Sequence, residues 1–281
     1  MARVVLAAIV SLLLLVGITA QASERPLDPD NTVILQLDDG PIVIELNPVF
    51  APVTSAQFKR LVREGFYDGL GFYRVIDGFV AQGGDGSDMS EEENAEPGIE
   101  AEFERDWDQE LRFVPVQSPD LFAPETGFID GFPAARDAES GKVWLAHCPG
   151  TVGMARGNEP DSGSTDFYIV IGQAPRYLER NITAFGRVVY GMDVVQRIKR
   201  GPPEQGGMIA AKTDATVIQS ARLLADVTAE ERLSIAVPDT NSDEFRAMFE
   251  ARRNRTADWF VSAPPAVLDV CQIPNHGRLL L

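Results

Sequence analysis

Alternating apolar and polar residues predict a series of short β-strands between residues 32 and 225. The first two, TVILQL (32–37) and PIVIEL (41–46), flank an Asp-Asp-Gly sequence that suits a tight turn between antiparallel strands. Further strand candidates follow at residues 72–76, 79–83, 151–155, 166–171, 183–189 and 216–225. The chain is therefore expected to be mainly β.

Two helices are predicted among these strands. The first covers residues 52–65, where Phe58, Leu61 and Val62 share one face. The second covers residues 192–199. Many short strands with only two interior helices are typical of a closed β-barrel with helices over its ends.

Two segments interrupt this pattern and together form a long loop insertion at about residues 86–146. Residues 85–110 contain twelve acidic residues against the single basic residue Arg105. This acidic run lacks the regularly alternating ligands of an EF-hand, so a solvated loop is favoured over a calcium site. Residues 112–141 are rich in proline, glycine and phenylalanine, and we expect this apolar part to pack against the barrel.

A C-terminal extension, residues 227–281, follows the predicted barrel domain of residues 23–226. In the extension, Phe245, Met248 and Phe249 mark the apolar face of a helix. The extension is small for an independent core, so we expect it to pack on the barrel.

The first 22 residues have the pattern of a secretory signal peptide. Arg3 precedes an uncharged run from Val4 to Ala20, and the small residues Ala20 and Ala22 suit a signal peptidase. An uncleaved anchor is the alternative, but the seventeen-residue run is shorter than the roughly 20 residues that span a bilayer. We therefore expect an exported chain that starts near Ser23 and has no stable association with the membrane.

The formal net charge of −17 makes nucleic acids and anionic lipid surfaces poor partners. Removal of residues 1–22 takes away only Arg3, which leaves 24 basic and 42 acidic residues and a charge of −18. Hydrophobic residues make up 44 % of the chain, so a substantial core is expected rather than disorder.

The two cysteines, Cys148 and Cys271, are predicted to form a disulfide, because an even number of cysteines in an exported protein favours a bridge. Two buried free thiols are the alternative. A catalytic Cys148 is disfavoured, since the adjacent His147 would point to the opposite face of a strand. A zinc site built from both cysteines with His147 and His276 is disfavoured because the spacings match no standard zinc knuckle.

The sequence FYRVIDGFVAQGGD (72–85) holds one arginine among apolar and aromatic residues but no histidine, cysteine, serine or lysine. It resembles the signature of the cyclophilin-type peptidyl-prolyl cis-trans isomerases. Other blocks resemble that family in the same order; they are residues 32–46, 47–66, 150–156, 164–169, 177–179 and 184–193. The resemblance covers about residues 32–226, although the stretch between residues 85 and 151 is longer than the family usually has.

This resemblance implies a closed eight-stranded antiparallel β-barrel capped by two α-helices, with the active groove on its outer face. It implies Arg74, Phe79 and Gln82 as the catalytic residues. It also implies six substrate-binding residues, which are Val80, Ala155, Arg156, Tyr168, Tyr177 and Leu178. The sequence contains no cofactor motif, and neither a cofactor nor a metal ion is expected.

Four positions depart from the best-known members of the family. Arg156 replaces an asparagine that often holds the substrate backbone, although bacterial relatives commonly carry arginine there. Tyr177 replaces a tryptophan, Asp166 a glutamine and Ile182 a histidine at the pocket rim. Because the catalytic set is retained, these changes concern substrate preference and the binding of cyclosporin-like inhibitors rather than activity.

The implied reaction makes and breaks no bond, which explains why the signature lacks an acid, a base and a nucleophile. We expect Arg74 to stabilise the twisted imide in a periplasmic enzyme that acts, as a monomer, on proline-containing polypeptides during folding of exported proteins. A cyclophilin-like chaperone or interaction module, with the insertion lying over the groove, is the alternative. In isolation, an ion-paired Arg74 and a core Phe79 would be simpler interpretations, but the ordered blocks favour the catalytic one.

Overall fold

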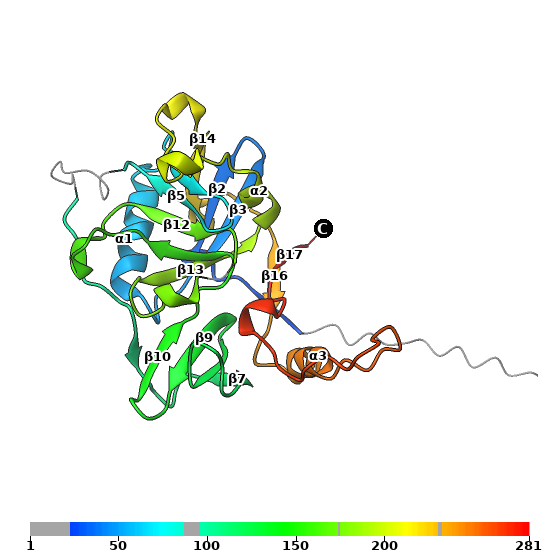
Figure 1. The fold of residues 1–281 in the computed structure, drawn as a ribbon. Helices are drawn as coiled ribbons and strands as arrows, with labels where there is room; N and C mark the ends of the chain where they lie inside the picture. Colours follow the sequence, from blue (N-terminus) through cyan, green and yellow to red (C-terminus); the bar gives the residue numbers. More distant parts are fainter. Residues whose placement is uncertain (1–22, 87–95, 174, 230–231, 281) are drawn as a thin grey trace, which may run out of the picture.

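The computed structural model describes residues 23–86, 96–173, 175–229 and 232–280, which form three antiparallel sheets and three α-helices (Figure 1). The predicted signal peptide, residues 1–22, lies outside the described residues. No helix in the described ranges is both long and apolar enough to cross a membrane.

The main sheet curls around the largest apolar core. Its strands lie in the order β14-β4-β5-β12-β11-β13-β3-β2-β15. Their bounds are β2 (Thr32–Leu37), β3 (Gly40–Leu46), β4 (Gly71–Ile76), β5 (Val80–Gly84), β11 (Thr151–Met154), β12 (Phe167–Val170), β13 (Ala184–Tyr190), β14 (Thr216–Val217) and β15 (Ser220–Leu223). The predicted opening hairpin is present as β2 and β3.

Two helices pack on this sheet, as predicted. Helix α1 (Pro52–Arg63) buries Phe58, whose ring lies 5.4 Å from that of Phe167 and 5.1 Å from that of Phe185. Helix α2 (Met192–Arg197) buries Val194 and Val195 in the same core. Aromatic contacts of this kind add to the burial of apolar area, so α1 is held firmly against β12 and β13.

The sheet has nine strands rather than the predicted eight. One strand was expected over residues 216–225, but this segment forms β14 and β15 at opposite ends of the sheet. Between them, Ile218 donates to the carbonyl of Leu70, while Gln219 donates to that of Gln36. The chain thus crosses from one edge to the other at these two residues. No pairing joins β14 to β15 in the described ranges, so the closed eight-stranded barrel is not confirmed.

The insertion forms a sheet of its own, and the prediction of a long loop is wrong. Its strands are β6 (Arg105–Asp106), β7 (Phe113–Gln117), β8 (Glu125–Ile129), β9 (Phe132–Asp137) and β10 (Lys142–Leu145), in the order β6-β10-β9-β8-β7. Asp130 and Gly131 turn β8 into β9 with φ angles of 46° and 93°. Both lie in the left-handed region that suits a tight hairpin turn. Residues 87–95 of the acidic run lie outside the described residues.

The C-terminal extension contacts both the barrel and the insertion. Its strand β16 (Ile235–Pro238) pairs with β1 (Glu24–Pro26) and β17 (Arg278–Leu279) in the third sheet, and packs against barrel residues Val43 and Val189. The predicted helix is present as α3 (Asp243–Arg253). It packs on the insertion rather than on the barrel, with the ring of Phe245 5.1 Å from that of Phe128.

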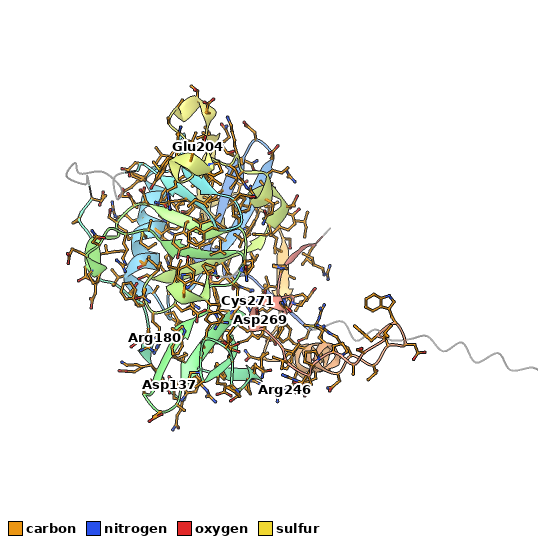
Figure 2. All side chains as sticks on the ribbon, in the orientation of Figure 1. Asp137, Arg180, Glu204, Arg246, Asp269 and Cys271 are labelled. Carbon is orange, nitrogen blue, oxygen red and sulfur yellow. A yellow bond between two sulfur atoms is a disulfide. The ribbon has the colours of Figure 1, made fainter. Side chains whose placement is uncertain are left out.

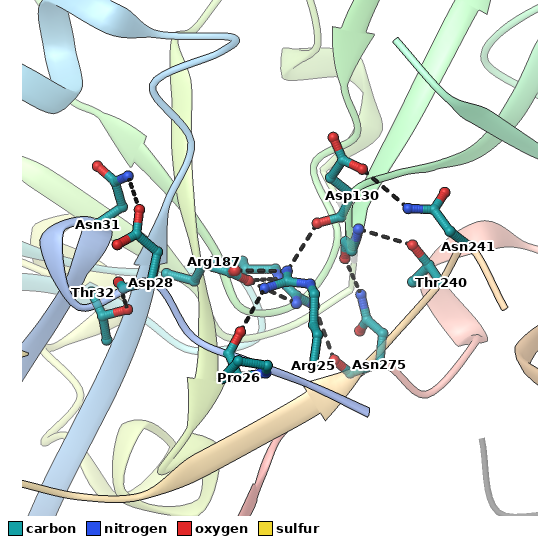
Figure 3. Close-up of polar contacts among 12 residues, drawn as sticks. Arg25, Pro26, Asp28, Asn31, Thr32, Asp130, Arg187, Thr240, Asn241 and Asn275 are labelled. Carbon is teal, nitrogen blue, oxygen red and sulfur yellow. Dashed lines mark hydrogen bonds and ion pairs between the residues drawn. The ribbon is translucent and has the colours of Figure 1, made fainter. Parts of the chain in front are cut away.

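A buried ionic cluster joins these parts (Figure 3). Glu45 of β3 accepts from Arg187 Nε and Nη2 at 3.0 and 2.9 Å, and its other oxygen lies 2.6 Å from Arg25 Nη2. Arg25 also donates to the carbonyl of Asp130 in the insertion, while Arg187 donates to that of Asn275 in the extension. Buried charges are tolerated only when they are paired and hydrogen-bonded. This cluster therefore fixes how the N-terminal strand β1, the barrel, the insertion and the C-terminal extension meet.

The predicted disulfide is present between Cys148 and Cys271, whose Cα atoms are 4.9 Å apart. Figure 2 shows Cys271 beside Asp269, beneath the barrel. Cys271 lies in the 3-10 helix η8 (Val270–Gln272), so the bridge ties the extension to the segment that precedes β11. The other 3-10 helices within the described residues are η1 (Pro29–Asn31), η3 (Pro160–Ser162), η4 (Arg176–Leu178), η5 (Pro203–Gln205), η6 (Lys212–Asp214) and η7 (Leu224–Asp226).

Candidate active site

The signature sequence folds as the hairpin of β4 and β5, which places Arg74 directly opposite Gln82. Paired residues in antiparallel strands project on the same face, so these two side chains meet on the outside of the barrel. Gly84 ends the hairpin with a φ of 140°, and a Cβ there would lie 1.9 Å from Asp166 Oδ1. A glycine is therefore required at this position for β5 to approach the segment that carries Asp166.

An open groove of about 260 Å³ lies over this hairpin and the neighbouring strands. It is lined by Arg74, Phe79, Val80, Gln82, Ala155, Arg156, Tyr168, Leu178 and Ile182. Eight of the nine residues predicted to act in catalysis or substrate binding thus come together in one place. The ninth, Tyr177, does not line the groove and is 69 % exposed.

One wall of the groove is polar. Arg74 Nη1 donates to Gln82 Oε1 at 3.0 Å. Gln82 Nε2 donates to the hydroxyl of Tyr73 at 2.6 Å, and this hydroxyl donates to Asp166 Oδ2 at 2.7 Å. The Gln82 amide thus holds the guanidinium of Arg74 at the groove, and the hydroxyl of Tyr73 in turn holds the Gln82 amide.

Another part of the groove wall is apolar. Val80, Ala155, Tyr168 and Val170 form a buried cluster, against which Phe79 packs from the groove side. The side chains of this wall are apolar apart from the Tyr168 hydroxyl, which lies 2.9 Å from His147 Nε2, so the wall suits a saturated ring.

A family model described as cyclophilin type peptidyl-prolyl cis-trans isomerase/CLD matches residues 32–222, well over half of the chain. The chain belongs to the cyclophilin-type peptidyl-prolyl cis-trans isomerases. The resemblance seen in the signature is thereby confirmed, as is the prediction that the chain is an enzyme of this class.

Relatives support the same assignment for this cyclophilin-type chain. A "Probable peptidyl-prolyl cis-trans isomerase" of Brucella suis biovar 1 (strain 1330) is 37 % identical over 207 residues, which are 74 % of this chain and 90 % of the relative. The "Peptidyl-prolyl cis-trans isomerase A" of Dickeya dadantii (strain 3937) is 28 % identical over 230 residues, 80 % of this chain and 99 % of the relative.

A solved structure matches more than the barrel. The crystal structure of cyclophilin AquaCyp293 from Hirschia baltica superposes with a TM-score of 0.74 at 29 % sequence identity. The match covers 92 % of this chain and 94 % of that one. It therefore extends beyond the residues that match the family model.

Arg156 lies at the groove, but its guanidinium is bonded to the chain itself. Its Nε and Nη2 donate to the carbonyl of Asn181 at 3.0 and 2.9 Å, and Nη1 donates to that of Gly157 at 2.8 Å. The ring of Phe103 lies 5.5 Å away. The side chain therefore shapes the loop beside Ala155 more than it offers charge to a ligand.

The loop that carries Leu178 is anchored from behind by the insertion, a feature that the sequence analysis missed. The guanidinium of Arg176 is buried and pairs with Glu179 and, at 3.3 Å, with Asp120. Glu179 also accepts from Trp144 Nε1 at 2.8 Å. The described residues of the insertion support this loop, and none of them lines the groove. No local sequence signal marks these contacts between distant segments.

Tyr168 forms part of the groove wall and is bonded to a buried histidine. Its hydroxyl lies 2.9 Å from His147 Nε2. Burial lowers the pKa of His147 to about 4, with a smaller contribution from the charge of Arg176. Burial also raises the pKa of Tyr168 far above its usual value, so this hydroxyl stays protonated. The wall is therefore uncharged at neutral pH.

The buried His147 is expected to make the fold less stable in acid. Its pKa is about 4 in the folded chain and about 6.5 in the unfolded chain, so only the unfolded chain takes up a proton as the pH falls between these values. Stability should fall by about 3 kcal/mol from pH 7 to pH 4 through this group alone. Urea unfolding at several pH values, compared between the wild type and His147→Asn, measures this difference.

His276 provides the comparison for that experiment. Partial burial and then the charge of Arg187 lower its pKa in the same direction, so His276→Asn should remove part of the acid dependence, but less than His147→Asn removes. Identical pH profiles for His147→Asn and the wild type would show that His147 does not carry this effect.

Proposed function

We propose that this cyclophilin-type enzyme accelerates X–Pro isomerisation in exported polypeptides, and that Arg74 stabilises the twisted imide. The isomers of an X–Pro bond differ little in free energy, yet a barrier of about 18–20 kcal/mol separates them. The barrier arises because the nitrogen lone pair is delocalised into the carbonyl. Rotation about the bond therefore needs a stabilised twisted state, and it needs no acid, base or nucleophile.

In the twisted state the lone pair returns to the prolyl nitrogen, which becomes a better hydrogen-bond acceptor. A guanidinium beside that nitrogen binds the twisted state more strongly than either planar isomer, and only such differential binding lowers the barrier. Arginine suits this task because it keeps its charge when partly desolvated and offers five N–H donors in a fixed geometry. Arg74 has Nη1 engaged with Gln82, which leaves the rest of the fork to face the groove.

The observation that carries the proposal is that Arg74 lines the same groove as the apolar wall of Phe79, Val80 and Tyr168. The wall would hold the pyrrolidine ring while the segment at Ala155 and Arg156 would bind the flanking backbone. A proline-containing polypeptide is the substrate that fits both parts. The chain charge of −17 favours this over nucleic acid, and we propose that the enzyme acts as a monomer.

Export to the periplasm is proposed from the pattern of residues 1–22 and is supported by the Cys148–Cys271 disulfide. Slow X–Pro isomerisation limits folding for tens of seconds or longer, so an isomerase is useful where exported chains fold. The alternative, a chaperone or interaction module with the groove covered by the insertion, finds no support in the open groove.

A direct assay tests this function. The purified protein should raise the cis-to-trans rate of a proline-containing test peptide above the uncatalysed rate, in proportion to enzyme concentration. Exchange spectroscopy by NMR measures this without a coupling protease. A cis-to-trans rate equal to the uncatalysed rate at high protein concentration would reject the hypothesis that the protein is an isomerase. Mass mapping of the protein from a periplasmic fraction tests the predicted start near Ser23.

A further inference from the structure

A chain of three hydrogen bonds connects a buried carboxylate to Arg74. Asp166 Oδ2 accepts from the Tyr73 hydroxyl at 2.7 Å, Tyr73 accepts from Gln82 Nε2 at 2.6 Å, and Gln82 Oε1 accepts from Arg74 at 3.0 Å. Asp166 is fully buried, and its other oxygen accepts from the N–H of Gly86 at 3.2 Å. Tyr73 and Asp166 do not line the groove.

The carboxylate of Asp166 fixes which group donates and which accepts in each of these three hydrogen bonds. A carboxylate can only accept, so the one proton of the Tyr73 hydroxyl is committed to Asp166. Tyr73 must then use a lone pair toward Gln82, which therefore presents its NH₂ group inward. An amide has its oxygen on the other side, so the carbonyl of Gln82 has to face Arg74.

With the amide reversed, Gln82 would point an N–H group at the N–H groups of Arg74. Two donors facing each other repel, and the guanidinium would turn away from the place it occupies. Since catalysis by a preorganised donor depends on its position at the reacting nitrogen, the direction of the amide matters for the rate. The free energy needed to place Arg74 is supplied by folding, so the guanidinium is already in position before the substrate binds.

We propose that Tyr73 and Asp166 are positioning residues for the isomerase reaction, which fix the Gln82 amide so that its oxygen holds Arg74 at the groove. This inference rests on the proposed role of Arg74. It adds two residues outside the predicted catalytic and substrate-binding set, one of which, Asp166, stands where the best-known family members carry glutamine.

The experiment compares two tyrosines that each lose only a hydroxyl. Tyr73→Phe removes the middle of the chain and should lower kcat about tenfold with KM within twofold. Tyr67→Phe is the matched control, because the buried Tyr67 hydroxyl donates to the carbonyl of Thr165 at 2.8 Å and Tyr67 does not line the groove. The control should cost stability but leave kcat within twofold. Equal kcat values for the two variants would overturn the proposal.

Asp166→Asn is a second variant. It keeps a hydrogen-bonding side chain at this position but no longer forces the Tyr73 hydroxyl to donate. An asparagine side chain can donate as well as accept, so Tyr73 is no longer forced to donate to it, and kcat should fall several-fold while the folded state is retained. Wild-type kcat in a folded Asp166→Asn protein would contradict the role of the carboxylate.

A double-mutant cycle shows whether the effect passes through Arg74. In an Arg74→Ala background, at an enzyme concentration raised to give a measurable rate, Tyr73→Phe should cause no further loss. An unchanged tenfold loss there would mean that Tyr73 acts by another route. If Arg74→Ala itself has no effect, the proposed mechanism fails; if only Tyr73→Phe has none, the positioning role alone fails.

Discussion

Replacement of Arg74 by alanine is expected to lower kcat/KM for X–Pro isomerisation by about 100- to 1,000-fold, which is typical for the loss of one preorganised donor. The donor acts mainly on the twisted state, so the loss should appear in kcat, with KM changed little. The side chain is half-buried on β4 and points into an open groove, so the variant should remain folded. NMR exchange rates on a proline-containing peptide provide the measurement, and a thermal unfolding curve checks the fold.

Two further variants serve as the comparison and the control for this experiment. Arg74→Lys keeps the charge but replaces the planar fork by a single ammonium, so we expect activity between those of the wild type and the alanine variant. Arg63→Ala removes an exposed arginine that pairs with Asp226 away from the groove, and should leave kcat unchanged. A kcat/KM within tenfold of the wild type for Arg74→Ala would reject the catalytic role of this residue.

The hairpin that carries Arg74 and Gln82 was predictable from the sequence because the residues that specify it are close together in the chain. Arg74 and Gln82 are paired across a single turn, and residues 72–85 contain both strands, the turn and the glycines that end it. The partners that hold the site from behind were not predictable in this way. Tyr73 and Asp166 are 93 residues apart in the chain, and only the folded sheet brings them together.

The insertion was misjudged for a different reason, because a local signal existed and was given too little weight. Asp130-Gly131 is the same kind of turn sequence as the Asp-Gly pair that predicted the first hairpin. On its two sides, residues 125–129 and 132–137 pair as β8 and β9. A composition rich in proline, glycine and phenylalanine suggested a loop, whereas strand pairing satisfied the backbone groups of this apolar segment.

Removal of the Cys148–Cys271 disulfide is expected to lower the free energy of unfolding by about 5 kcal/mol. The two cysteines are 123 positions apart, and the bridge removes much of the freedom that the unfolded chain would otherwise have over that long loop. Both residues belong to the cluster in which α3 and η8 pack against the insertion. Urea unfolding of the wild type and of a Cys148→Ala, Cys271→Ala double variant measures the loss.

Because the chain has no other cysteine, a reductant supplies the control. Reduced wild type should unfold near the midpoint of the double variant, and the reductant should not change the double variant at all. The isomerase rate below the unfolding transition should stay within twofold, since neither cysteine lines the groove. An unfolding midpoint unaffected by reduction would mean that the C-terminal extension is held by packing and by the cluster of Glu45, Arg25 and Arg187 rather than by the bridge.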